Sequence, residues 1–170
     1  AFSLHFSAPS PSAENDPSIP YIRAGAIELG LSGSLTTVEG LSRGLASVRG
    51  GTFLSAINGL VGFEAELSYS HVQSLDRVDV LGHLSWQRAV GRSSVYPYVA
   101  IGGGIRKEWI GSFRQVRVPL GFSLGLRALL SQRVAFRTEY RFLRVMSDPI
   151  SNFSEHQLTI GLSIFFRNST

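Results

Sequence analysis

The chain has 170 residues, which is enough for one domain with a sizeable core, and its formal net charge is +4. It contains no cysteine, so disulfides, thiolate catalysis and thiolate metal sites are excluded. Charged residues make up 16% of the chain, against about 25% in an average soluble domain. The sequence contains no dense run of Lys and Arg of the kind that would indicate nucleic-acid binding.

Residues 1–23 differ in composition from the rest of the chain. They begin at Ala1 without a methionine, as a chain with a removed secretory signal or an internal start would. The stretch APSPSAENDPSIP then carries four prolines, which disfavour a helix or a central strand. We predict an extended proline-rich N-terminal arm, either as a disordered terminus or as a segment ordered against a partner or inside the domain.

From residue 24 to residue 166, apolar and polar side chains alternate with a period of two, and no helical period of useful length occurs. No apolar run reaches the length of about 18 residues that a transmembrane helix needs. Asn58-Gly59 is a signal for a tight hairpin turn. The alternation predicts eight strands, near residues 24–35, 45–56, 61–69, 78–90, 96–106, 116–129, 134–142 and 157–166.

Eight strands of this length predict an all-β fold, an eight-stranded antiparallel up-and-down transmembrane β-barrel, because a tilted strand crosses a bilayer in about 9 to 11 residues. The connections after the second, fourth and sixth strands are short, whereas the others are longer, notably residues 107–115 and 146–155. We therefore predict short turns at the rim that holds both termini, and longer loops at the other rim. The barrel would occupy residues 24–166, followed by a C-terminal tail of residues 167–170.

The polar face of each strand indicates which face lies inside. It is rich in Gly, Ser and Thr with isolated charges of both signs, whereas the outer face of a soluble barrel would be densely charged. Charges in a narrow lumen must pair, since an unpaired buried charge is heavily penalised. The predicted lumen charge network consists of Glu28, Arg49, Glu64, Glu66, Asp79, Arg127, Arg137, Glu139 and Arg141. Aromatic residues at strand ends, among them Trp86, Tyr96, Tyr69 and Trp109, would form two interfacial girdles. A soluble lipocalin-like barrel is the alternative.

The last strand carries the most specific pattern, with Thr159, Gly161, Ile164 and Phe166 in the order polar, glycine, apolar and aromatic. In this pattern the chain resembles the small eight-stranded outer-membrane barrels of Gram-negative bacteria, the OmpA/OmpX-like group, over residues 24–166. The resemblance implies an integral location in the bacterial outer membrane, with short periplasmic turns and longer extracellular loops. It also implies that these four residues are an assembly signal for the barrel-assembly machinery. The chain departs from the group in its proline-rich arm and in running on past the last aromatic residue.

His83 and Ser85 resemble the His-x-Ser pair of outer-membrane lipid A deacylases. Residues two apart on a strand share a face, where a base can reach a hydroxyl nucleophile. The motif of that family continues with Asn where this chain has Trp86, and its pair faces lipid, whereas the predicted phase turns His83 and Ser85 inward. A hydrogen-bonded pair in the lumen is the alternative.

Basic residues gather around the connection after the fifth strand, namely Arg106, Lys107, Arg114 and Arg117. Because arginine matches phosphate geometry, we predict contacts with lipopolysaccharide phosphates there, with a solvated basic loop as the alternative. The histidines are dispersed, so we expect no metal site and no cofactor.

The pattern as a whole favours a non-enzymatic barrel with a structural or interaction role. Eight strands leave an interior just wide enough for side chains to fill, and residues 1–23 would be available to a protein partner or as a plug of the lumen. The alternatives are a channel for small solutes or hydrophobic compounds, and a lipid A deacylase.

Overall fold

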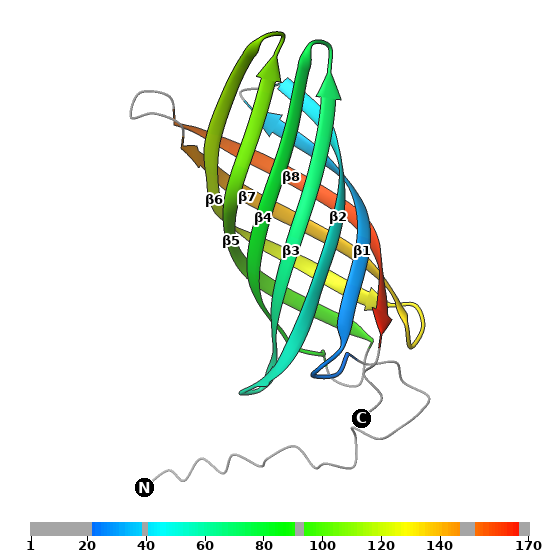
Figure 1. Ribbon diagram of the computed structural model, residues 1–170. Helices are drawn as coiled ribbons and strands as arrows, with labels where there is room; N and C mark the ends of the chain where they lie inside the picture. The colour runs from blue at the N-terminus through cyan, green and yellow to red at the C-terminus, as the bar shows by residue number, and fades with distance from the viewer. Residues whose placement is uncertain (1–21, 39–40, 91–93, 147–151, 167–170) are drawn as a thin grey trace, which may run out of the picture.

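The structure, a computed structural model, describes residues 22–38, 41–90, 94–146 and 152–166. These residues form eight β-strands in a closed antiparallel barrel, in which each strand pairs with the next and β8 pairs with β1 (Figure 1). The strands are β1 (Ile27–Val38), β2 (Leu41–Ala56), β3 (Gly59–Val72), β4 (Leu75–Gln87), β5 (Val95–Ile110), β6 (Phe113–Leu129), β7 (Val134–Met146) and β8 (Phe153–Phe166). The predicted eight-stranded antiparallel barrel is therefore confirmed. The described residues contain no helix long and apolar enough to cross a membrane.

Several strands run further toward one rim than the sequence predicted. The expected loop at residues 107–115 is a hairpin in which β5 continues to Ile110 and β6 begins at Phe113. The turn between them holds Gly111, whose φ of 59° is a left-handed conformation that favours glycine. The connection after β4, in contrast, spans residues 88–94. The predicted contrast between short turns and longer loops is not confirmed in the described residues, because residues 107–110 and 113–115 continue strands β5 and β6.

The hairpins β3–β4 and β5–β6 rise above the ends of the other strands (Figure 1). The pairing of β6 with β7 ends at Val118 and Met146, so residues 113–117 pair only with β5 among the described residues. On the other side, the pairing of β2 with β3 ends at Ala46 and Tyr69. We call residues 70–76 and 106–117 the projecting sheet. Within the described chain, both of its outer edges lack a neighbouring strand.

The barrel carries apolar side chains outside and polar side chains inside. On β8, Leu158, Ile160 and Leu162 are about half exposed, at 50%, 53% and 54%. The alternate residues Gln157 and Thr159 are buried at 2% and 1% exposure. This distribution is the reverse of that of a soluble barrel, and it matches a barrel whose outer wall faces lipid.

An apolar cluster closes the lumen at the rim where β1 begins and β8 ends, with Ile27 paired to Phe166. We call this cluster the plug. Its buried members are Ile22, Ala26, Phe53, Tyr96, Leu129, Ala135 and Phe165. The Ile22 N–H donates a hydrogen bond to the Tyr96 hydroxyl at 3.1 Å. Tyr96 is thus a lumen residue, not a member of the predicted outer girdle. Most of the predicted arm and the whole predicted tail (residues 1–21 and 167–170) lie outside the described residues.

Candidate functional site in the lumen

Eight of the predicted lumen charges meet in one group, which we call the central cluster. Its members come from β1, β2, β3, β6 and β7, and each is at most 5% exposed. They are four arginines and four glutamates: Arg49, Arg127, Arg137, Arg141, Glu28, Glu64, Glu66 and Glu139. The cluster is electrically balanced, which an interior of low polarity requires.

Glu64 joins three arginines at the centre of this group. Its carboxylate oxygens lie 2.6 Å from Arg127 Nη2, 2.6 Å from Arg137 Nη1 and 3.2 Å from Arg49 Nη1. Glu139 pairs with Arg137 at 2.7 Å and with Arg49 at 3.1 Å. The ion pairs therefore cross the lumen from β3 to β6 and β7, and link opposite walls of the barrel.

Aromatic and amide side chains that sequence analysis missed complete the central cluster. The Tyr98 hydroxyl accepts a hydrogen bond from Arg137 Nε at 2.7 Å and donates one to Glu139. The Arg127 guanidinium lies over the Tyr98 ring, 4.4 Å from its centroid, and donates a hydrogen bond to Gln87. Both Tyr98 and Gln87 lie on the inward-facing positions of their strands. The alternation in the sequence could therefore have identified them as lumen residues.

Asp79 belongs to a second group nearer the other rim, which we call the outer cluster. It comprises Arg77, Asp79, Arg106 and Glu155, each at most 2% exposed. Arg106 Nε lies 2.9 Å from Asp79, and Arg106 Nη1 lies 2.7 Å from Glu155. On β4, the buried Leu81 stands between Asp79 and the residues that line the central cluster. The single network expected from the sequence is therefore two networks.

The four basic residues predicted to contact lipopolysaccharide divide between the two faces of the wall. Arg106 is fully buried in the outer cluster, and Arg117 faces inward, 2.9 Å from Glu108. These two are not placed to reach lipid phosphates, because β5 and β6 continue as strands and alternate residues turn into the lumen. Lys107 and Arg114 are exposed on the outer face, Arg114 directly opposite Trp109 in the β5–β6 ladder.

His83 and Ser85 both face the lumen, at 7% and 1% exposure. The Ser85 hydroxyl donates a hydrogen bond to Glu64 at 3.0 Å, and His83 Nε2 lies 3.6 Å from Glu66. Ser85 is hydrogen-bonded to a central-cluster glutamate, whereas the buried His83 Nε2 has no hydrogen-bond partner among the described residues. No hydrogen bond joins the two side chains. Among the described residues, no group of three or more histidines and carboxylates has the arrangement of a metal site.

The predicted assembly residues lie on both faces of β8. Thr159 is buried and its hydroxyl hydrogen-bonds to Ser34 at 2.8 Å. A Cβ on Gly161 would lie 2.6 Å from the Leu31 carbonyl oxygen, so β1 packs too closely there for a side chain. Ile164 and Phe166 are each 49% exposed on the outer face. Their role in assembly stays a prediction.

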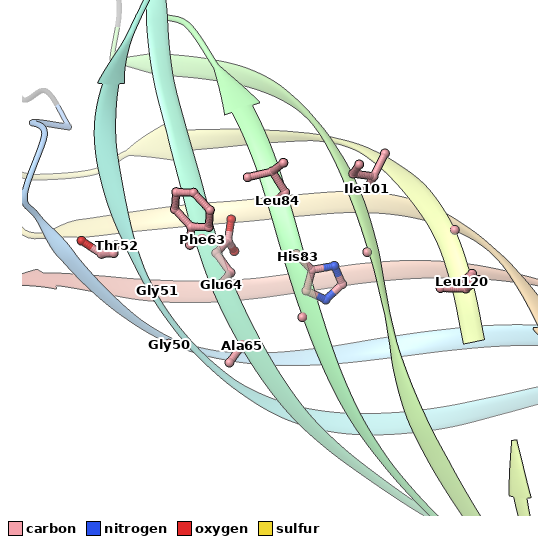
Figure 2. A pocket seen from close by; sticks show the side chains of 13 residues that line it. Gly50, Gly51, Thr52, Phe63, Glu64, Ala65, His83, Leu84, Ile101 and Leu120 are labelled. Carbon is pink, nitrogen blue, oxygen red and sulfur yellow. The ribbon is translucent and has the colours of Figure 1, made fainter. Parts of the chain in front are cut away.

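A groove crosses the outer wall over β2 to β5, where small residues lie directly opposite one another. The row is Gly50, Ala65, Gly82 and Gly103. Figure 2 shows this groove, with a volume of about 850 Å³, bordered by outward apolar side chains such as Phe63, Leu84 and Ile101. The groove is a dent in the apolar wall, and the ionisable side chains of the same strands turn into the lumen.

No protein-family model matches the chain, and no curated protein sequence matches it either. Several solved structures are similar in fold. The N-terminal β-barrel domain of Pseudomonas aeruginosa OprF has a TM-score of 0.65 and 14% identity, over 84% of this chain and 98% of that one. The outer membrane enzyme PagL has a TM-score of 0.55 and 11% identity, over 81% and 98%. Ail, the attachment invasion locus protein of Yersinia pestis, in complex with the heparin analogue sucrose octasulfate, has a TM-score of 0.52 and 13% identity, over 85% and 100%.

Identities this low show the fold and not the activity, and one of these structures is an enzyme. The match in fold agrees with the closed eight-strand topology and the outward apolar face. The chain therefore has the fold of the small eight-stranded bacterial outer-membrane β-barrels.

Proposed function

We propose that the protein is an integral outer-membrane barrel with a structural or interaction role and no enzymatic activity. The observation that carries this proposal is the filled lumen. The plug, the central cluster and the outer cluster follow one another along the lumen, and their side chains are almost entirely buried. A lumen occupied by ion-paired side chains is that of a closed barrel, which agrees with the narrow interior that eight strands allow.

The outer face supports the membrane location. Residues such as Leu124 and Ile160 are about half exposed at 52% and 53%. Arginine or lysine on the lipid face of a barrel costs about 2 to 4 kcal/mol at the bilayer midplane and about 0 to 1 near the interface. Lys107 and Arg114, which are exposed next to Trp109, belong on this reasoning at the level of the lipid headgroups, and we assign them to contacts with lipopolysaccharide phosphates.

An interaction role is supported by the projecting sheet. Edge strands present unpaired N–H and C=O groups, which can bind an added strand of another protein. The edge at residues 113–117 lies beyond the last residue of β6 that pairs with β7. At the opposite rim, Ile22 is anchored in the plug, and residues 1–23 are the segment we assign to a second protein partner.

The His83 and Ser85 pair, which resembles the deacylase motif, does not support an enzymatic role. The Ser85 hydroxyl is bound to Glu64, behind the barrel wall and away from lipid. A lipid substrate on the outer face would not meet this hydroxyl. We expect lipid A from cells with and without the protein to give the same mass spectrum.

Single-channel conductance in planar bilayers tests the closed lumen. The purified full-length chain is expected to insert without a stable open current, because the central and outer clusters occupy the lumen. The OprF barrel, purified and inserted in the same way, serves as a reference for insertion of the same fold. A stable current that changes in size on Glu64→Gln would overturn the proposal in favour of a channel.

A further inference from the structure

The described side chains at the outer end of the lumen carry an excess of positive charge. Beyond Leu81, the inward-facing side chains of β2, β4, β5, β6 and β8 include four arginines and three carboxylates. They are Arg43, Arg77, Arg106, Arg117, Asp79, Glu108 and Glu155. The central cluster, with four of each sign, has no such excess. Among the described residues, the outer end therefore has one guanidinium group more than its carboxylates can neutralise.

Arg43 is the guanidinium that has no counterion among the described residues. Asp79 and Glu155 are engaged by Arg77 and Arg106, and Glu108 is engaged by Arg117. Within the residues that the structure describes, no carboxylate lies within salt-bridge distance of Arg43. The side chain is partly buried. Through space, the charges of Arg77 and Arg106 oppose its positive charge, and those of Glu108 and Glu155 favour it. A partly buried cation near two like charges is stabilised by an anion.

Two buried hydroxyl groups at the same level lack hydrogen-bond partners within the described part of the chain. Thr36 lies directly opposite Arg43 in the β1–β2 ladder and is 1% exposed. Ser70 lies directly opposite Arg77 in the β3–β4 ladder and is 3% exposed. Neither side-chain oxygen has a partner among the described residues, although buried hydroxyls are normally hydrogen-bonded. Each is an unused donor for an acceptor that enters from the outer mouth.

We propose that Arg43, Thr36 and Ser70 form a binding site for one tetrahedral oxyanion, a phosphate or sulfate group, at the outer mouth of the lumen. The guanidinium group supplies a charge-assisted hydrogen bond and the hydroxyls supply neutral ones, which is a donor set suited to such an anion. The bound anion offsets the excess positive charge of this end of the lumen. The group is either a free anion or a substituent on a saccharide outside the cell.

Isothermal titration calorimetry on the full-length chain in detergent micelles tests this site. The probes are sodium phosphate, sodium sulfate and sucrose octasulfate at constant ionic strength. Saturable binding is expected, and Arg43→Gln should weaken it about tenfold or more, the loss expected for a charge-assisted hydrogen bond. Thr36→Val, which keeps the shape and removes the hydroxyl, should weaken binding by a smaller factor. Arg133→Gln, an exposed arginine in the turn at the opposite rim, is the matched control and should bind as the unmodified chain does.

The arms of the experiment separate the two sources of the anion. Binding of phosphate or sulfate alone, with the Arg43 dependence, supports a site for free anions. Binding of sucrose octasulfate alone, with the same dependence, supports a site for a saccharide substituent. The proposal is overturned if no probe shows saturable binding. It is also overturned if the folded Arg43→Gln and Thr36→Val variants bind as tightly as the unmodified chain.

Discussion

Glu64 contacts Arg49, Arg127 and Arg137 together. It is one of two carboxylates that join three arginines of the central cluster, the other being Glu139. Glu64→Ala leaves these buried guanidinium groups short of a counterion. Removing one partner of a buried ion pair typically costs about 3 to 5 kcal/mol, so we expect the free energy of unfolding to fall by that order. Urea titration of the folded barrel in micelles measures the change.

Glu108→Ala is the matched control for this prediction. Among the described residues, Glu108 pairs with Arg117 alone, and their side chains are 12% and 16% exposed. Solvent therefore reaches both and takes up part of the lost interaction. We expect a clearly smaller loss of stability. Equal losses for the two variants would show that the number of arginine partners does not set the cost.

At the scale of the strand pair, close approach of β6 and β7 requires a residue without a side chain at position 121. A Cβ on Gly121 would lie 1.9 Å from the Phe142 carbonyl oxygen. Gly121→Ala therefore forces the two strands apart, and overpacking of this kind typically costs about 1 to 3 kcal/mol. Gly44→Ala on β2, where a Cβ meets nothing within 4 Å, should change the urea midpoint little. A Gly121→Ala barrel as stable as the unmodified one would contradict this account of the packing.

The outer faces of the strands should respond to charge according to depth. Leu124 lies in the middle of β6 and is 52% exposed, whereas Leu41 is the first residue of β2 and is 78% exposed. In lipid vesicles, Leu124→Arg should lower the free energy of unfolding by about 2 to 4 kcal/mol and Leu41→Arg by about 0 to 1 kcal/mol. A similar small effect at both positions would count against a lipid-facing wall.

Alternation in the sequence was enough to predict all eight strands, but their ends were harder to place. Residues 107–115 contain Lys, Glu, Gln and Arg, and such polar stretches favour a loop assignment. In the barrel, cross-strand pairing extends β5 and β6 through this stretch. Arg106 therefore turns into the lumen as part of the outer cluster. The sequence also predicts a loop at Glu155, whereas in the barrel this residue lies on β8 and pairs with Arg77 and Arg106.

At the scale of the whole molecule, the inward phase of each strand predicted which charges lie in the lumen but not which of them meet. Arg49 and Glu139 are 90 positions apart and are joined by an ion pair. Their contact depends on the stagger between strands around the closed barrel, which no single strand encodes. The same stagger separates Asp79 from the central cluster. The division into two networks is therefore a property of the closed barrel and could not be predicted from the strands taken one at a time.

The plug has a consequence for how the barrel closes. It contains Ile22 and Ala26 from before the first strand and Phe165 from the last, together with Phe53 from β2. The cluster is therefore complete only when β1 and β8 meet, and only in the register that pairs Ile27 with Phe166. A seam shifted by two residues would keep every side chain on its correct face but would displace Phe165, whose ring centroid lies 6.1 Å from that of Phe53. Packing of the plug thus stabilises one register of the β1–β8 seam. Alternation alone does not distinguish this register from those shifted by two residues.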